Sequence, residues 1–327
     1  MAPVRAVSGR ADVRLTHDAV LGDVVVVDTG GTSVRLGHLR GGVPARAMET
    51  ASSAALRVDE ARATLAELVR AYADRHALAP TVVVMGMPGM LDRERDTFDH
   101  CNNIPQLEGT GLRGELTARL GCPVLLEQDI MLQLLGEHRT GAARGSRAVF
   151  GVYFGTGIGA AYLQDGDPFR RGAASLQAGH IPMLGRGTPC LCGNRDCVEA
   201  HASGHTLTAL AACADIPVET LFAHRGDPDL DRALDEFVTL HAWTVATAVT
   251  LLEPDDVLVG GGIPAMAGYP HERLDRTTRA HLQSPRPAET LRISRASLGH
   301  HGALHGALAL IDLHSDDSHL PQPTIPT

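Results

Sequence analysis

The sequence predicts an α/β protein built from two similar domains that face a cleft. Two segments carry this prediction: "VVVVDTGGTSVRLGHL" in the first half of the chain and "AVFGVYFGTGIGAAYL" in the second. Each has the pattern of a buried strand, a glycine-containing turn and a second strand that pairs with the first. Strands and helices alternate after both segments, as is typical of α/β domains.

The first half begins with the strand "DVVVVD" and its hairpin partner "SVRLGHL". A helix is expected over 55–76, because Leu65, Leu68, Val69 and Tyr72 recur at helical spacing. Further elements follow in order: a buried strand "TVVVMGMPG", a helix near 111–120, a short strand "PVLLE" and a helix that begins around Asp129.

The second half continues from the repeated hairpin into a cysteine-rich loop and several helices. A long helix is expected near 229–252 and must stop at Pro254, and the strand "DDVLVGGG" follows it. We therefore expect a small first domain over 23–124, a large second domain over 125–300, a C-terminal helix over about 301–314 that packs back on the first domain, a flexible tail over 1–22 and a disordered tail over 315–327.

The composition excludes several classes of function. A net charge of -9 argues against a surface that neutralises nucleic-acid phosphates. No run approaches the roughly 18 to 20 apolar residues of a membrane span, and the N-terminus lacks an apolar secretion segment, so we expect a cytoplasmic protein with no membrane partner. All 29 basic residues are arginine, which excludes a Schiff-base lysine and a phosphate loop that ends in Gly-Lys-Ser/Thr.

Half of the six cysteines lie in the segment "GHIPMLGRGTPCLCGNRDCVE". Disulfide frameworks are typical of short secreted chains with an even set of cysteines, which this cluster is not. One imidazole and three thiolates fit a closed tetrahedral zinc site of the structural kind, with unmetallated or redox thiols as the alternative. The expected ligands are His180, Cys190, Cys192 and Cys197.

Three glycine segments have the character of nucleotide-binding turns. In "DTGGT" and "GTGIG" the backbone N–H groups can approach a phosphate closely, although an ordinary hairpin turn also uses such glycines. A carboxylate at the end of the first strand can hold a hydrated cation. The segment "GGG" after a strand can let a flat base pack on bare backbone, or can simply form a close turn. The predicted residues are Asp28, Gly30, Gly31, Thr32, Gly155, Thr156, Gly157, Gly260, Gly261 and Gly262.

Asp129 in "LEQDIMLQL" stands at the start of a predicted helix, directly after a strand. A helix cap would explain an aspartate at this position. A carboxylate at a cleft can also act as a general base that accepts the proton of a substrate hydroxyl as its oxygen attacks a γ-phosphate. Both interpretations fit the local sequence.

Taken together, these motifs resemble the ROK family (repressors, open reading frames, kinases), within the superfamily of actin-like sugar kinases and heat-shock ATPases. The resemblance covers about residues 23 to 313, and "GHIPMLGRGTPCLCGNRDCVE" matches the family's zinc signature almost residue for residue. It implies two actin-like (ribonuclease H-like) α/β domains that flank a cleft, with ATP, Mg²⁺ and structural Zn²⁺ as cofactors. Asp129 falls on the family's catalytic aspartate. The implied sugar contacts are Gly89, Asn103, Gln128, Asp129, Gln177, His180 and Glu199, of which Gln128 and Gln177 stand where the family usually has Asn and Glu.

By this resemblance the chain is expected to phosphorylate the 6-hydroxyl of an aldohexose and to form a homodimer. Within the family, segments such as "YFGTGIGAAYLQDG" and "EPDDVLVGGGI" most resemble the D-allose kinases, so D-allose is the expected sugar. Alternatives are a glucokinase, an N-acetylhexosamine kinase and a catalytically silent sugar sensor. A family repressor is not expected, because the 22 residues before the first strand are too few for a three-helix DNA-binding domain.

Overall fold

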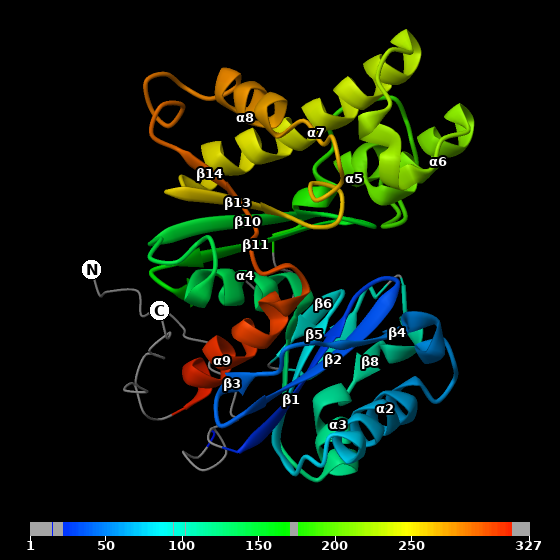
Figure 1. Cartoon of the computed structure of the whole chain (residues 1–327), viewed down its shortest axis with the longest axis vertical. Coiled ribbons are helices and arrows are strands. Elements are labelled where there is room, and N and C mark those ends of the chain that lie inside the picture. Colours follow the sequence, from blue (N-terminus) through cyan, green and yellow to red (C-terminus); the bar gives the residue numbers. More distant parts are fainter. Residues whose placement is uncertain (1–14, 16–21, 94, 102, 171–175, 316–327) are drawn as a thin grey trace. The chain divides into compact units, whose positions relative to one another are not determined.

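The computed structural model describes residues 15, 22–93, 95–101, 103–170 and 176–315, and it divides the chain into two α/β units. Unit 1 comprises residues 1–129 and 307–327, and unit 2 comprises residues 130–306 (Figure 1). Apart from residues 15, 22 and 315, the two predicted tails lie outside the described residues.

The sheet of unit 1 has the strand order β3-β2-β1-β5-β9, with β4 paired to β2. β1 and β2 form the predicted antiparallel hairpin, and β5 and β9 extend the sheet in parallel. The valines of β1 are buried because both faces of the strand are covered. The strands are β1 (Asp23–Thr29), β2 (Ser33–Arg40), β3 (Val43–Pro44), β4 (Glu49–Ser52), β5 (Pro80–Met87) and β9 (Val124–Gln128).

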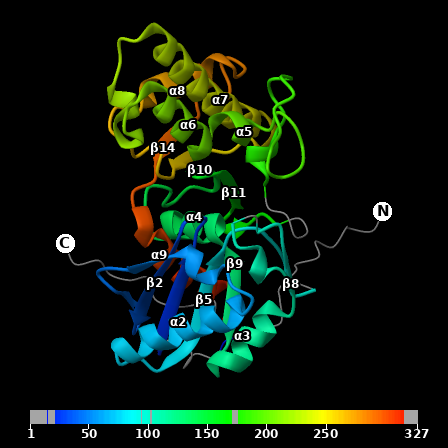
Figure 2. The same ribbon diagram turned by 90° about the vertical axis from the view of Figure 1, so that its right-hand side faces the viewer.

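Helices α2 (Ala61–Arg75) and α3 (Leu112–Leu120) contact each other and contribute Leu65, Val69 and Leu116 to the core of unit 1 (Figure 2). The predicted helix over 55–76 is shorter in the structure. A 3-10 turn, η1 (Ser53–Leu56), precedes it, and residues 57–60 separate the two. A small sheet that the sequence did not predict consists of β6 (Met90–Asp92), β7 (Thr97–Asp99) and β8 (Gly109–Thr110), with the 3-10 turn η2 (Pro105–Leu107).

The sheet of unit 2 repeats this pattern, with the order β12-β11-β10-β13-β14. β10 pairs antiparallel with β11, and β13 and β14 follow in parallel, as β5 and β9 do in unit 1. The predicted quasi-repeat is therefore present in the strand pairing. The strands are β10 (Ala148–Phe154), β11 (Ile158–Gln164), β12 (Asp167–Pro168), β13 (Asp256–Gly260) and β14 (Arg292–Arg295).

The long helix α7 (Pro228–Leu252) supplies much of the apolar core of unit 2. The Asp227 side chain caps its start by accepting the N–H of Asp229, and Glu253 ends it in a left-handed conformation just before Pro254. The other helical elements are α4 (Asp129–Thr140), η3 (Ala178–His180), α5 (Val198–Ala202), α6 (Gly204–Ala214), η4 (Val218–Ala223), α8 (His271–Ala280), η5 (Gly299–His301) and α9 (Gly302–His314).

The chain passes between the units inside two helices, at Asp129 in α4 and at Ala307 in α9. We expected the boundary at residue 124, before β9. The structure differs because β9 pairs in parallel with β5, from Val83↔Val124 to Met87↔Gln128, and so completes the first sheet.

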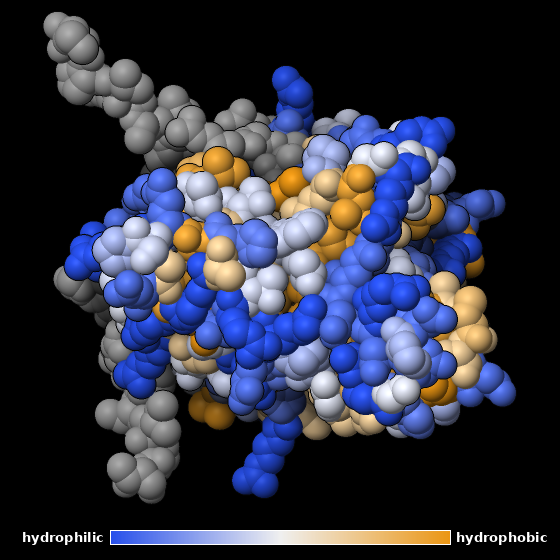
Figure 3. Space-filling model, turned by 90° about the horizontal axis from the view of Figure 1, so that it is seen from above, coloured by the Kyte–Doolittle hydropathy of each residue, from blue (hydrophilic) through white to orange (hydrophobic). Residues whose placement is uncertain are grey.

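Hydrophilic residues cover most of the face in Figure 3, and apolar residues form smaller areas between them. Within the described residues, no helix has both the length and the apolar character needed to cross a membrane.

Candidate active site

The first glycine turn joins β1 to β2 and is held by backbone and neutral side-chain contacts. The N–H of Gly30 donates to the carbonyl of Ser33 at 2.8 Å, and the Ser53 hydroxyl donates to the carbonyl of Gly31 at 3.0 Å. Asn103 lies over Gly31, because a Cβ on that glycine would come within 2.8 Å of the Asn103 amide nitrogen. The structure thus places a predicted sugar residue directly beside the predicted phosphate turn.

Asp28 is the second-last residue of β1, just before this turn, and is almost completely buried. Its Oδ2 lies 3.4 Å from Nη1 of Arg35 on the paired strand. The sequence suggested a carboxylate that holds a hydrated cation, and the structure adds an arginine that neutralises it. The ion pair with Arg35 orients the carboxylate at this buried position.

Asp129 is the first residue of α4 and follows the last residue of β9. It is partly exposed, as a group that exchanges a proton with a bound substrate must be. Its neighbour Gln128 is nearly buried and donates from Nε2 to the carbonyl of Gly89 at 2.7 Å. Gln128 was predicted as a sugar contact, and in the structure its amide holds the turn after β5 against the end of β9.

Gly89 has a structural reason to be glycine. Its φ of +131° is a conformation that side chains rarely adopt, and a Cβ would lie 2.9 Å from the carbonyl oxygen of Asp99. The structure therefore gives Gly89 a backbone role in unit 1, beside Gln128.

The second glycine turn, Gly155–Gly157, joins β10 to β11 in unit 2. It closes on itself through the N–H of Gly155, which donates to the carbonyl of Gly157 at 2.9 Å. Two neighbours hold it from outside. Oε2 of Glu199 accepts the N–H of Ile158 at 2.7 Å, and the N–H of Gly204 donates to the carbonyl of Gly155 at 2.8 Å.

The third glycine segment, Gly260–Gly262, begins at the last residue of β13 and lies against the end of β10. A Cβ on Gly261, whose φ is +97°, would come within 2.3 Å of the Phe154 carbonyl oxygen. That oxygen accepts the N–H of Ile263 at 3.0 Å. Phe154 immediately precedes Gly155, so the second and third glycine segments meet at this residue.

His180, Cys190, Cys192 and Cys197 converge as predicted. Their ligand atoms all lie within 4.8 Å of one another. Sγ of Cys190 lies 3.7 Å from Nδ1 of His180, and Sγ of Cys192 lies 3.7 Å from Sγ of Cys197. Bonds of about 2.3 Å to a tetrahedral zinc ion would give sulfur-sulfur edges of about 3.8 Å, so the donor set fits this metal.

The cysteine side chains of the cluster must lose their protons when they bind a metal ion. Burial raises the pKa of Cys197 to about 12, so a bare thiol here stays protonated. A bound Zn²⁺ reverses this preference because it stabilises the thiolate. Four protein ligands fill the tetrahedron and leave no position for a reacting water, which is the pattern of a structural site.

Asp196 organises the loop between the ligands. Its carboxylate accepts the backbone N–H groups of Gly187 and Thr188 at 2.7 and 3.0 Å and lies 3.3 Å from Nε2 of His201. Its pKa is lowered: desolvation opposes this, and the backbone hydrogen bonds and His201 outweigh it. The cysteine loop is therefore ordered by its own hydrogen bonds in addition to the cluster.

Gln177, the other predicted departure from the family pattern, is an exposed residue directly before η3. Its carbonyl accepts the N–H of His180 at 2.9 Å. Through its backbone it therefore fixes the start of the histidine-bearing turn.

Sequence reasoning missed His241, a fully buried residue of α7. Its Nε2 lies 2.7 Å from the carbonyl of Ala202, and its Nδ1 lies 2.9 Å from the Tyr269 hydroxyl. Its ring stacks on that of Phe154, with 3.6 Å between the ring centroids. Burial lowers the pKa of His241 to about 3, so the ring is neutral, with Nε2 donating and Nδ1 accepting. Its helical spacing from Leu234, Phe237 and Val245 is the signal that could have revealed its burial.

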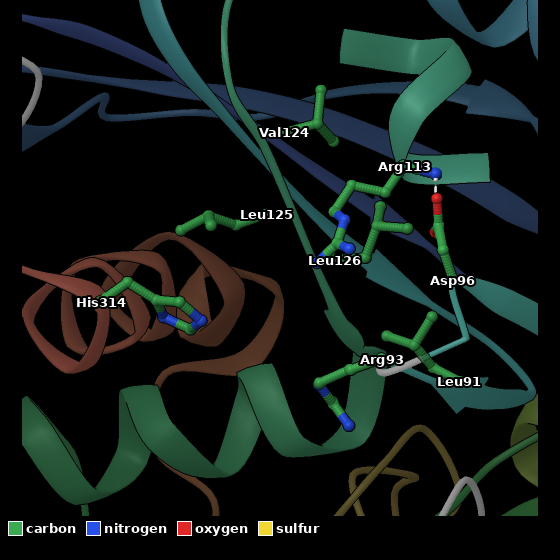
Figure 4. Close-up of a pocket in the computed structure, with 8 residues that line it drawn as sticks. All are labelled: Leu91, Arg93, Asp96, Arg113, Val124, Leu125, Leu126 and His314. Atoms are coloured by element: carbon green, nitrogen blue, oxygen red, sulfur yellow. Dashed lines mark hydrogen bonds between the residues drawn. The ribbon is translucent and has the colours of Figure 1, made fainter. Parts of the chain in front are cut away.

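A small pocket in unit 1 contains none of the predicted site residues. Figure 4 shows Asp96 beside the start of α3, where its Oδ1 accepts the N–H of Arg113 at 3.1 Å. Arg93 is paired with Glu127. The pocket is lined by Leu91, Arg93, Asp96, Arg113, Val124, Leu125, Leu126 and His314, and it is separate from the candidate site.

The structure thus collects the predicted residues in two groups, one in each unit. A model of the ROK family matches residues 24–313. The chain belongs to the ROK family. The resemblance found in the sequence is therefore correct at this level.

ROK proteins of known structure have the same fold. The ROK hexokinase from Thermus thermophilus has a TM-score of 0.72 and 29% identity, covering 88% of this chain and 97% of that chain. A ROK glucokinase from Streptomyces griseus, solved with glucose and AMPPNP, has a TM-score of 0.73 and 24% identity, covering 88% and 99%. The predicted class of two actin-like α/β domains is confirmed.

Among curated relatives, the N-acetyl-D-glucosamine kinase of Escherichia coli O127:H6 is 29% identical over 302 residues, covering 86% of this chain and 97% of the relative. The corresponding protein of Photobacterium profundum is 28% identical over 300 residues, with the same coverage of both chains. These names do not support the predicted similarity to D-allose kinases.

Proposed function

We propose that this ROK protein is an ATP-dependent sugar kinase that transfers the γ-phosphoryl group of Mg-ATP to the 6-hydroxyl of a hexose. The observation that carries the proposal is the hairpin with a glycine turn that occurs once in each unit, together with Asp129, which begins α4 directly after β9. The hexokinase and glucokinase names of the solved relatives and the kinase names of the curated relatives support the same reaction.

In the proposed reaction Asp129 accepts the proton of the sugar 6-hydroxyl. The O–H bond breaks as that oxygen forms a bond to the γ-phosphorus, and the bond from phosphorus to the bridging oxygen of ADP breaks. The glycine turns would offer to the phosphates the backbone N–H groups that they do not use internally, and Asp28 would hold a hydrated Mg²⁺, which would supply positive charge to the phosphates. Such a reaction depends mainly on positioning and charge neutralisation.

His180, Cys190, Cys192 and Cys197 would hold a structural Zn²⁺, whose contribution is to fix the cysteine loop. His180 and Glu199 are the proposed sugar residues of unit 2, and Asn103 and Asp129 those of unit 1. A ligand tied into a tetrahedral site keeps its ring orientation, so the cluster gives His180 a fixed direction.

N-acetyl-D-glucosamine is the first candidate sugar, because the curated relatives carry that name. D-allose, the sugar expected from the sequence, stays in the comparison as the competing candidate. N-acetyl-D-glucosamine differs from D-allose at carbon 2, which bears an acetamido group in place of a hydroxyl, and in the configuration of carbon 3, so the site must discriminate at both positions. The predicted homodimer remains a prediction that light scattering after size-exclusion chromatography would test.

The proposal is tested by ADP release with Mg-ATP on zinc-replete protein. The panel is N-acetyl-D-glucosamine, D-glucose, D-allose, D-mannose and N-acetyl-D-mannosamine at matched concentrations, compared by kcat/KM. We expect N-acetyl-D-glucosamine to exceed D-allose by at least about 100-fold. A preference for D-allose would restore the substrate expected from the sequence. No turnover with any hexose, together with thermal stabilisation by one of them, would indicate a sugar sensor instead.

A further inference from the structure

We propose that Glu199 is a positioning residue for the nucleotide phosphates, acting through the Gly155–Gly157 turn. This inference rests on the proposed kinase function and goes beyond the sugar contact that the family resemblance implies for Glu199. All the residues concerned belong to unit 2: the Gly155–Gly157 turn and the segment that follows Cys197.

The carboxylate of Glu199 occupies a slot made by two glycines. A Cβ on Gly157 would lie 2.6 Å from Oε2, and a Cβ on Gly179 would lie 3.3 Å from the same oxygen. Oε2 accepts the N–H of Ile158 at 2.7 Å. The side chain therefore contacts the far end of the turn between β10 and β11, and the turn leaves room for it by having no side chain of its own at Gly157.

The near end of the same turn is held from the same segment. Gly204, the first residue of α6, donates its N–H to the carbonyl of Gly155, and a Cβ on Gly204 would meet that oxygen at 2.9 Å. Residues 199 and 204 thus hold the turn at both ends, 41 and 49 residues away along the chain from their respective partners Ile158 and Gly155.

The segment that supplies these contacts, residues 197–204, is itself fixed on both sides. It begins at Cys197, a cluster residue whose backbone forms an antiparallel β-bridge with Pro182. The next residue, Val198, donates its N–H to the carbonyl of Ile181 at 2.9 Å. At its other end the Ala202 carbonyl receives the hydrogen bond from His241. His241 also stacks on Phe154, the residue before the turn. It therefore connects the segment after Cys197 to the strand that leads into Gly155–Gly157.

The consequence concerns nucleotide affinity. Backbone N–H groups bind a phosphate well only when they are already oriented toward it, because ordering a loose turn on binding weakens the net affinity. Without the Glu199 carboxylate, the N–H of Ile158 loses a charge-assisted acceptor and the turn loses one of its two external contacts. A residue that acted on the sugar alone would leave nucleotide binding unchanged.

The test measures the Kd of Mg-AMPPNP without sugar, and the KM values for ATP and for sugar, on zinc-replete full-length protein. The variants are Glu199→Ala, Glu199→Asp and Glu199→Gln. Glu219→Ala, which truncates an exposed glutamate of the same unit, is the matched control. We expect Glu199→Ala and Glu199→Asp to raise the nucleotide Kd about 10-fold, because neither side chain reaches Ile158. Glu199→Gln keeps an acceptor oxygen and should stay within about threefold of the wild type.

An unchanged nucleotide Kd in Glu199→Ala or Glu199→Asp, with a raised sugar KM, would overturn the inference and leave a sugar contact. If Glu199→Ala fails to fold, as judged by its metal content and thermal midpoint, the Asp and Gln variants decide between the same two outcomes. Failure of the proposed function is distinguishable, because the wild type would then neither bind Mg-AMPPNP nor release ADP.

Discussion

The two glycine turns of the molecule have similar sequences and equivalent positions in their sheets, yet they are held by different groups. In unit 1, Gly30 and Gly31 are fixed by Ser33, Ser53 and Asn103, which are neutral partners. In unit 2, the Gly155–Gly157 turn is fixed by the Glu199 carboxylate and by Gly204 at the start of α6.

This difference connects the cysteine cluster to the second glycine turn but not to the first. The contacts of the second turn come from a segment that begins at Cys197, whereas the described contacts of the first turn come from residues 33–103 of unit 1. Damage to the cluster should therefore affect the second turn and spare the first. The proposed base, Asp129, belongs to unit 1, so its loss should affect turnover rather than the support of the second turn.

The largest effect is expected for Asp129→Asn. The amide cannot accept the hydroxyl proton, so kcat should fall by about 10²- to 10⁴-fold while sugar affinity stays within a few fold. Steady-state rates and calorimetric sugar titration measure the two quantities. Near-normal turnover in this variant would remove Asp129 from the role of base.

Replacing a cluster cysteine should cost more stability than replacing a buried cysteine elsewhere. Cys197 and Cys101 are both almost completely buried, Cys197 in the cluster of unit 2 and Cys101 in the core of unit 1. We expect Cys197→Ala to lose bound metal and about 3 to 4 kcal/mol of stability, and Cys101→Ala to lose about 1 kcal/mol. Metal analysis and urea unfolding provide the comparison. Equal losses would mean that the cluster contributes no more than ordinary packing.

Replacing a glycine by alanine should cost much more stability at Gly261, where the backbone requires glycine, than at Gly31, where it does not. Gly261→Ala combines a φ of +97° with a backbone oxygen at 2.3 Å and should cost about 2 to 3 kcal/mol. Gly31→Ala meets the flexible end of Asn103 and should cost less than about 1 kcal/mol. Chemical unfolding of both variants tests the contrast, and the reverse ranking would contradict the geometry.

The smallest effect concerns pH and His241. Its folded pKa of about 3 lies below the ordinary value of 6.5, so the unfolded state binds the extra proton as the pH falls through 6.5. Stability from this group is complete above that pH and declines by about 1.4 kcal/mol per unit toward pH 3, or about 2 kcal/mol between pH 6.5 and 5. In His241→Gln, the plot of unfolding free energy against pH should lose this contribution of about 1.4 kcal/mol per pH unit below pH 6.5. The exposed His224→Gln variant should keep the wild-type slope, and the same slope in all three proteins would show that His241 is not buried as a neutral ring.

Local patterns were enough to predict both hairpins, the start of α4, the extent of α7 and the metal cluster, because each depends on residues close in sequence or on an unusual residue type. The unpredicted features depend on distant contacts. The short segment "RISR", whose two arginines are exposed and whose central residues are half-buried, becomes β14 only by pairing with β13. Likewise, Glu199 stands two residues after a cluster cysteine, and nothing in that position indicates that it accepts a hydrogen bond from Ile158, which lies 41 residues earlier. Long-range pairing and burial thus account for most of what the sequence left open.

Amide hydrogen exchange on the full-length protein, with and without its metal, tests the central claim most directly. We predict that metal removal speeds exchange at least about tenfold at the amides of Ile158 and Gly204. The amide of Gly30 in the first turn, and that of Ser53, which donates to the Thr32 carbonyl beside this turn, should be unchanged. Equal changes at the two turns, or no change at the second, would contradict the claim that the cysteine cluster supports the second glycine turn alone.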